Sequence, residues 1–321
     1  MSTSQSACPV SPVRLAVTLA CLASLAGLAS GQTISLTDID SGLTSPTGNY
    51  RWLNIADQAY KAAYRTGYNY TQASVQVTFD PDALTLHGTL SAANLKPNFA
   101  YQLKLAGYSD TPSNERIGLS GRWWQEEWNG TKWANGQNLN DKGVTGTSPN
   151  PNDAVYLARR DIPDASSPSG KHYRYTGYTV FDYFITDNNG NASLSFGADS
   201  CYHVLWKTSQ RGRTTADGPI ETGSFDVGPP LPAYDTDHPA ATVGVYGEWE
   251  RLPVGGVPLS PGDYACQIIL TEECFHGSGG QYAGGWAAAM GADINFHIVP
   301  EPTTLSLLAL AGLALMLRRA R

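Results

Sequence analysis

Apolar and polar residues alternate with a period of two along much of the chain from Ser74 onward. This period places alternate side chains on one face of a β-strand. Asp80-Pro81-Asp82 then turns the chain between two such runs. The apolar members of these first two predicted strands are Val75, Val77, Phe79, Leu84, Leu86 and Leu90.

The clearest predicted hairpin covers residues 178–196. Its two strands flank the turn Asp187-Asn188-Asn189-Gly190. Asn and Gly tolerate the positive φ angles that tight hairpin turns require. Further strands are predicted over residues 201–206 and 294–299.

A short helix is predicted near the start of the body, over residues 54–65. The segment contains helix formers, and Asn54 is a candidate N-cap. Tyr60 and Tyr64 lie four residues apart, on one face of such a helix, and Gly67 ends the pattern.

The composition favours strands and irregular loops over helical bundles. Charged residues make up 15% of the chain, and Gly (33) and Pro (20) are abundant. Residues 109–168 are rich in Trp, Asn, Gly and Pro and are expected to form a long loop insertion. The chain is therefore predicted to be mainly β. An irregular lead over residues 32–73 precedes a single elaborated β-sandwich over residues 74–299.

Two segments share a pattern of Leu-x-Pro, a short turn, a Tyr and a strand. They contain Leu95, Pro97 and Tyr101, and Leu259, Pro261 and Tyr264. The pattern resembles the entry to a late strand in fibronectin type III and other immunoglobulin-like sandwiches. The resemblance implies an immunoglobulin-like β-sandwich in which each tyrosine hydroxyl bonds back to nearby backbone.

Residues 1–31 have the order of a secretory signal peptide. Arg14 precedes an apolar run from Leu15 to Leu28, and small residues follow it. The run is shorter than the roughly 20 residues that a transmembrane helix needs. We expect cleavage to leave Gln32 as the first mature residue.

The C-terminal segment, residues 300–321, begins with Pro300-Glu301-Pro302. An apolar run over residues 303–317 follows, and Arg318, Arg319 and Arg321 end the chain. A hydrophobic helix of this run would be roughly 22 Å long, short of a bilayer core of about 30 Å. Its terminal arginines would stay cytoplasmic and leave the body outside. The alternatives are a plain tail anchor and a buried strand.

This order of features resembles the PEP-CTERM sorting domain. The resemblance covers only the C-terminal segment, with Pro300, Glu301, Pro302, Arg318 and Arg319 as the sorting signal. It implies that an exosortase, a membrane protease, removes the tail after the general secretion machinery has exported the body. Membrane insertion through the tail would then be transient, and the mature protein would reside at the cell surface or in the extracellular matrix.

The mature body is more acidic than the whole chain. The formal net charge is −7, and without Arg14, Arg318, Arg319 and Arg321 the count is 17 Lys and Arg against 28 Asp and Glu, or −11. Such a body repels phosphate backbones, so nucleic acid is not expected as a partner.

The predicted insertion contains a cluster of aromatic residues. Its tryptophans are Trp123, Trp124, Trp128 and Trp133, and Glu126 and Glu127 lie among them. Indole faces stack on sugar rings, so the cluster is a candidate contact for exopolysaccharide. The alternative is that the rings form a satellite core under the insertion.

Three cysteines remain after signal removal. Export favours a disulfide, with Cys266–Cys274 slightly preferred and Cys201–Cys266 as the alternative. The first pairing requires the chain to reverse between its cysteines, because an extended run would separate them by over about 20 Å.

Metal and catalytic signals are weak. The histidines show no ligand spacing, so no metal site is predicted, although the acidic turns over residues 187–191 and 235–237 could hold calcium. Carboxylates occur in pairs at Glu126/Glu127, Glu248/Glu250 and Glu272/Glu273, but no spacing marks an acid and a nucleophile.

The sequence therefore predicts an exported, exosortase-processed surface or matrix protein with a non-catalytic structural role. The first alternative is a carbohydrate-binding module that uses the Trp-rich loop. The second is an enzyme that acts on polysaccharide.

Overall fold

The computed structural model describes residues 31–40, 49–139, 153–197, 204–207, 221–225, 230–238, 240–247, 259–273 and 286–300. The helical elements are η2 (Asn49–Trp52), α2 (Ala62–Gly67), η3 (Tyr70–Gln72), α3 (Pro112–Ser120) and α4 (Asp153–Arg159). The strands are β1 (Gln32–Asp38), β2 (Ser74–Phe79), β3 (Asp82–Ala83), β4 (His87–Ala93), β5 (Ala100–Gly107), β6 (Arg122–Trp128), β7 (Trp133–Asn138), β8 (Tyr173–Ile185), β9 (Ala192–Gly197), β10 (Val204–Lys207), β11 (Glu221–Phe225), β12 (Ala241–Gly247), β13 (Gly262–Glu273) and β14 (Trp286–Ile298).

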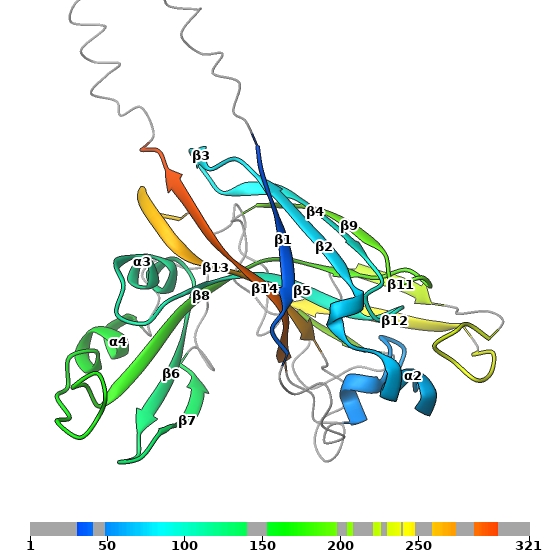
Figure 1. Cartoon of the computed structure of the whole chain (residues 1–321), viewed down its shortest axis with the longest axis horizontal. Helices are drawn as coiled ribbons and strands as arrows, with labels where there is room; N and C mark the ends of the chain where they lie inside the picture. The colour runs from blue at the N-terminus through cyan, green and yellow to red at the C-terminus, as the bar shows by residue number, and fades with distance from the viewer. Residues whose placement is uncertain are drawn as a thin grey trace, which may run out of the picture. The chain divides into compact units, whose positions relative to one another are not determined.

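Most strands belong to one large sheet with the order β7-β6-β8-β5-β13-β14-β1-β2-β4-β9 (Figure 1). Its described pairs are antiparallel, apart from β3, which pairs in parallel with β14. A smaller sheet has the order β10-β12-β11. The chain is thus mainly β, as predicted.

Strand β1 joins two layers of the large sheet. Its residues from Gln32 to Leu36 pair with β2, whereas Thr37 and Asp38 pair with β14. One hydrophobic core contains residues of β2, β4 and β9 together with residues of β5, β8, β13 and β14. Phe181 of β8 stacks on Phe196 of β9 at a centroid distance of 5.4 Å, although these strands are not sheet neighbours. The arrangement is sandwich-like.

The predicted alternation is confirmed in β2. Val75, Val77 and Phe79 are buried, and the residues between them are exposed or half-buried. The second strand starts later than predicted, with β4, so that Leu84 and Leu86 lie before it; Leu84 is exposed and Leu86 is buried.

The predicted hairpin at Asp187-Asn188-Asn189-Gly190 is wrong. Strand β8 pairs with β5 and β6, and β9 pairs with β4. The turn instead bonds to the segment before β5, since Leu95 N donates to Gly190 O and Asn98 N donates to Asp187 O. The sequence predicts the turn itself correctly, but the turn connects β8 in one layer with β9 in the other, and these two strands do not pair.

The prediction of a loop insertion over residues 109–168 is also wrong. The segment contains α3, β6, β7 and α4, and β6 pairs with β8 in the large sheet. α3 begins with Thr111 as its N-cap, whose hydroxyl accepts Asn114 N, and with Pro112 in its first turn. The segment therefore extends the sheet.

The N-terminal helix is shorter than predicted. α2 begins only at Ala62, because the Asn54 side chain accepts the backbone N–H groups of Ala56 and Gln58 and forms a turn instead. The expected neighbours Tyr60 and Tyr64 do stack, with ring centroids 5.3 Å apart.

Both predicted tyrosine–backbone contacts are present. The Tyr264 hydroxyl donates to Ser260 O at 2.7 Å, and the Tyr101 hydroxyl accepts Lys96 N at 3.1 Å. Each bond fixes the turn that leads into a central strand, β13 or β5. The wider immunoglobulin-like resemblance stays a prediction.

A buried carboxylate lies at the centre of the core. Glu272 of β13 is fully buried, and its oxygens lie 2.6 Å from Arg51 Nε and 2.6 Å from Lys96 Nζ. The Tyr70 hydroxyl donates to the same carboxylate at 2.5 Å. Burial alone would raise the pKa of Glu272, but the charges of Lys96 and Arg51 outweigh it and lower the pKa to about 2.

The strand that contains Cys266 argues against the Cys266–Cys274 disulfide. β13 runs without reversal from Gly262 to Glu273, so the chain reversal that this pairing needs is absent from the described strand, and Cys274 itself lies outside the described residues. Cys266 is a free thiol, and burial raises its pKa to about 12. Cys201, its alternative partner, lies outside the described residues.

Residues 1–30 and 301–321 lie outside the described part of the chain, and most of the sorting signal lies there with them. Strand β1 begins at Gln32, and β14 ends at Ile298. Pro300, the first residue of the sorting signal, is described and exposed. Every helix among the described residues is too short or too polar to cross a bilayer.

Replacing Glu272 by Gln should destabilise the fold by about 3–5 kcal/mol, because the change removes the buried anion that Lys96 and Arg51 share and leaves Arg51 paired with Asp40 alone. Urea unfolding of the mature body measures the effect. The matched control is Glu115→Gln, which breaks a pair with Arg160 whose side chains are 38% and 36% exposed. The control should change stability by less than about 1 kcal/mol. Equal effects of the two changes would contradict the role assigned to Glu272.

Candidate functional site

The Trp-rich stretch forms strands β6 and β7 at one edge of the large sheet (Figure 1). β6 pairs with β8 in a regular antiparallel register, with Trp124 opposite Thr176 and Glu126 opposite Arg174. Successive side chains of a strand point to opposite faces, so Trp123 and Trp124 cannot share one surface. The prediction of a Trp-rich loop is wrong in this respect.

Trp123 is a core residue. It is fully buried, stacks on Tyr156 of α4 at a centroid distance of 3.7 Å and meets Tyr175 of β8 edge-on at 6.1 Å. Its Nε1 donates to Asp153 Oδ1 at 3.0 Å. The prediction of a carbohydrate contact is therefore wrong for Trp123, and the satellite-core alternative is correct for this residue.

The other three tryptophans lie on the opposite face and are half-buried. We call this surface the tryptophan face, and its members are Trp124, Glu126, Trp128, Trp133 and Arg174. Trp128 meets Trp133 edge-on at a centroid distance of 5.3 Å. The Arg174 guanidinium lies 5.0 Å from the centre of the Trp133 ring and donates to Glu126 Oε2 at 2.6 and 2.9 Å. Aromatic surface and a fixed ion pair thus occur side by side.

Trp124 lies against the backbone of β7. A side chain at Gly136 would place its Cβ 2.6 Å from the Trp124 ring, so the indole needs a glycine at this position. Trp124 also packs beside the buried residues Ala106, Tyr178 and Val180. These contacts hold the ring in place while part of it stays exposed.

The tryptophan face has the chemistry to bind a molecule that is both apolar and hydroxylated. Indole rings offer apolar faces, and the Glu126–Arg174 pair offers an acceptor and donors beside them. A sugar ring presents C–H groups on its faces and hydroxyls at its rim. The indoles and the Glu126–Arg174 pair could contact such a ring through stacking and hydrogen bonds alone.

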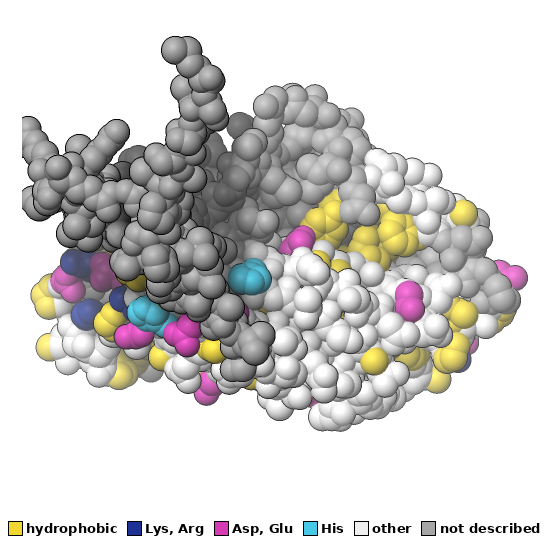
Figure 2. Space-filling model, turned by 90° about the horizontal axis from the view of Figure 1, so that it is seen from above, with side chains coloured by type: hydrophobic (Ala, Val, Ile, Leu, Met, Phe, Trp, Pro, Cys, Tyr) yellow, Lys and Arg dark blue, Asp and Glu magenta, His cyan; other side chains and the backbone are white. Residues whose placement is uncertain are grey.

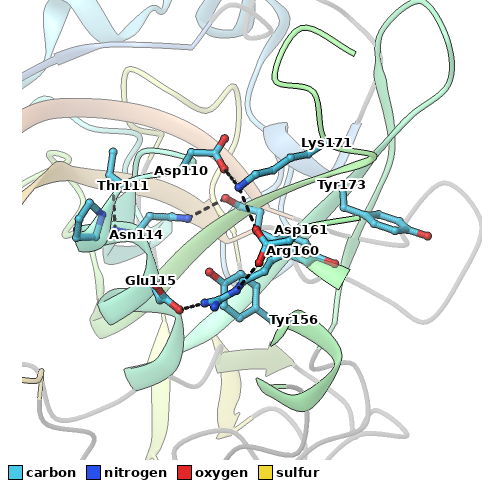
Figure 3. Close-up of a pocket in the computed structure, with 11 residues that line it drawn as sticks. Asp110, Thr111, Asn114, Glu115, Tyr156, Arg160, Asp161, Lys171 and Tyr173 are labelled. Atoms are coloured by element: carbon cyan, nitrogen blue, oxygen red, sulfur yellow. Dashed lines mark hydrogen bonds and ion pairs between the residues drawn. The ribbon is translucent and has the colours of Figure 1, made fainter. Parts of the chain in front are cut away.

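The opposite face of the same strands carries a pocket of about 320 Å³ (Figure 3). Its lining residues come from the start of α3, the end of α4 and the start of β8. They are Asp110, Thr111, Pro112, Asn114, Glu115, Tyr156, Arg160, Asp161, Lys171, Tyr173 and Tyr175.

A chain of ion pairs crosses this pocket. Lys171 Nζ lies 2.8 Å from Asp110 Oδ1 and 3.5 Å from Asp161 Oδ1. Arg160 Nε lies 3.1 Å from Asp161 Oδ2, and the same guanidinium pairs with Glu115 (Figure 3). The hydrogen bond to Asp110 raises the pKa of Lys171. These charged side chains pair with one another, and the ion pairs do not mark any one of them as a general acid or a nucleophile.

Charged groups are concentrated at this end of the body. In Figure 2, Lys, Arg, Asp and Glu side chains gather at the left, the side on which Figure 1 places α3, α4 and β6. Within the described part of that view, the remaining surface is mostly neutral. The pocket lies at this charged end of the body, because residues of α3 and α4 line it.

The paired carboxylates of the sequence have separate roles. Glu272 belongs to the core network, and Glu273 lies 2.6 Å from Lys104 Nζ and accepts the Thr271 hydroxyl. Burial raises the pKa of Glu273, although Lys104 acts against it. Glu248 and Glu250 lie outside the described residues.

The described residues contain no group of three or more His, Cys, Asp or Glu arranged to hold a metal ion. At the first predicted calcium turn, Asp187 Oδ1 accepts the N–H groups of Asn189 and Asn191, both at 2.8 Å, which is ordinary turn chemistry. Calcium at this turn and at residues 235–237 stays a prediction.

Sequence reasoning missed several residues of this region, among them Tyr156, His172 and Arg174. They lie 20 or more positions from the Trp cluster. The β6–β8 pairing brings His172 and Arg174 to it, and the packing of α4 brings Tyr156. The alternation of Tyr173 and Tyr175 was the available signal, because it indicates a strand with one aromatic face.

Trp123→Ala should destabilise the body by about 3–5 kcal/mol, because it empties a fully buried site. Trp128→Ala is the matched control on the same strand and should cost clearly less, since Trp128 is half-buried. Thermal or urea unfolding compares the two. A greater loss for Trp128 would contradict the assignment of the two faces.

Comparison of the chain with protein-family models, with curated proteins and with solved structures finds no match.

Proposed function

We propose that this chain is an exported protein of the cell surface or extracellular matrix, with a non-catalytic structural role, whose C-terminal tail is removed by an exosortase. The observation that carries the proposal is the order Pro300-Glu301-Pro302, apolar run and terminal arginines. The general secretion machinery and the exosortase are its implied partners.

The position of the strands supports this proposal. β1 begins at Gln32, the residue expected to follow signal cleavage, and β14 ends at Ile298, just before the sorting signal. Removal of both end segments takes no residue from a described strand. The body can therefore keep its β1–β14 pairing after processing.

The second candidate function is carbohydrate binding through the tryptophan face. A specific observation favours it, namely three half-buried indoles on one sheet face beside the Glu126–Arg174 ion pair. A structural protein embedded in exopolysaccharide would use such a surface to hold the polymer. The two functions are compatible.

Deleting residues 303–321 should release the body into the medium without tail processing, because the apolar run and the arginines are then absent. The matched variant Glu301→Ala/Pro302→Ala keeps the apolar run and should stay membrane-associated and unprocessed. Intact mass of the secreted native protein, with cell fractionation, measures both. Mature protein that retains residues 303–321 would overturn the sorting proposal.

Trp124→Ala and Trp128→Ala should each weaken binding to a soluble bacterial exopolysaccharide several-fold, because each removes a stacking surface. The control is Tyr108→Ala, an exposed aromatic residue that follows β5 and bonds to Asp293. Binding isotherms with purified mature protein provide the measurement. Unchanged affinity in both Trp variants would exclude the tryptophan face as the contact.

A further inference from the structure

His172, just before β8, joins two carboxylates from different segments. Its Nδ1 lies 3.0 Å from Asp164 Oδ2, and its Nε2 lies 3.0 Å from Glu127 Oε1 on β6. A neutral imidazole has a single N–H, so one of these contacts would set a lone pair against a carboxylate. Only the imidazolium can donate to both oxygens. The geometry therefore favours the protonated ring.

A short series of hydrogen bonds connects this ring to the tryptophan face. The Ser166 hydroxyl donates to Asp164 Oδ1 at 2.6 Å, and Trp128 Nε1 donates to Ser166 Oγ at 3.1 Å. The backbone adds a direct link, since Trp128 N donates to His172 O at 2.9 Å. The position of the Trp128 indole thus depends on the 163–171 loop, which His172 ties to β6.

The surroundings of His172 favour its charged form. Hydrogen bonds to Asp164 and Glu127 raise the pKa of His172, and those from Ser166 and His172 lower the pKa of Asp164 to about 2. The Tyr173 ring meets the imidazole edge-on at 4.7 Å. The His172 side chain is 29% exposed, so it exchanges protons directly with solvent.

The other charged groups close to His172 form ion pairs with residues other than Asp164 and Glu127. Lys171 pairs with Asp110 and Asp161 across the pocket, and Arg174 pairs with Glu126 on the tryptophan face. Among the described groups at the contact of His172 with Asp164 and Glu127, His172 is the one whose ordinary pKa lies near neutral pH.

We propose that His172 is a positioning residue for the tryptophan face: in its protonated state it clasps the 163–171 loop to β6 and thereby fixes Trp128. When the ring loses its proton, one of the two contacts becomes repulsive and the clasp opens. Since the pKa of His172 is raised, the clasp is complete below the ordinary histidine value and is lost as the pH rises through the higher, folded-state value. An effect of this clasp on carbohydrate binding rests on the second function proposed above, in which the tryptophan face binds carbohydrate.

Hydrogen–deuterium exchange of the mature body at about pH 6 and about pH 9, corrected for intrinsic rates, tests the clasp. In the unaltered protein, protection of residues 163–171 and of the end of β6 should fall several-fold at the higher pH. His172→Gln should show low protection at both values. The control His297→Gln alters a histidine paired with Asp263 and should behave like the unaltered protein.

Asp164→Asn provides a second variant for the case in which His172→Gln perturbs folding. It removes one carboxylate, so the histidine pKa measured by NMR should fall and protection should be lost at a lower pH. Exchange that responds to pH equally in the unaltered protein and in both clasp variants would overturn the proposal. A His172 pKa at or below the ordinary value of about 6.5 would do the same.

Binding of a soluble bacterial exopolysaccharide at the same two pH values separates this inference from the function on which it rests. Tighter binding at the lower pH in the unaltered protein, but not in His172→Gln, supports the clasp and its effect on the tryptophan face. pH-dependent exchange without binding at either pH supports the clasp and contradicts the carbohydrate function. Binding that is identical at both pH values, with unchanged exchange, overturns the clasp alone.

Discussion

The carboxylate of Glu272 is the constraint on which much of the fold depends. A charge in a dry core must be neutralised, and here the neutralising groups come from distant parts of the chain. Arg51 belongs to the lead before β2, and Lys96 belongs to the turn before β5. The lead is therefore not an appendage. It supplies one of the two cations that compensate the buried charge of the central strand β13.

The same sheet provides the rigid base of the candidate site. β5 and β13 lie in the core, and β8, β6 and β7 continue the sheet beyond it. The two faces of this extension, formed by β8, β6 and β7, have different surroundings. α3 and α4 cover one face, which holds Trp123 and the pocket with its chain of ion pairs. The other face presents the remaining tryptophans. One strand thus serves both packing and an exposed surface.

Local patterns predicted local structure well. The alternation of Val75 and Val77 identified β2, and the repeated Leu-x-Pro pattern identified two turns closed by tyrosine hydroxyls. Pairing was harder to predict, because it is decided by contacts distant in sequence. β9 follows a good hairpin turn but pairs with β4, and β6 pairs with β8 across some fifty residues. Alternation could separate Trp123 from Trp124, but it could not show which face the helices would cover.

The pairing of β1 with β14 has a consequence for the order of folding. β1 lies at the beginning of the body and its partner β14 is the last described strand. The second layer cannot close on β1 until β14 is present as well, so the contact that joins the layers has nearly the largest sequence separation the body allows. Such a topology delays collapse into a finished domain. In the export route proposed above, this delay would keep the chain in the extended form that a narrow channel can pass.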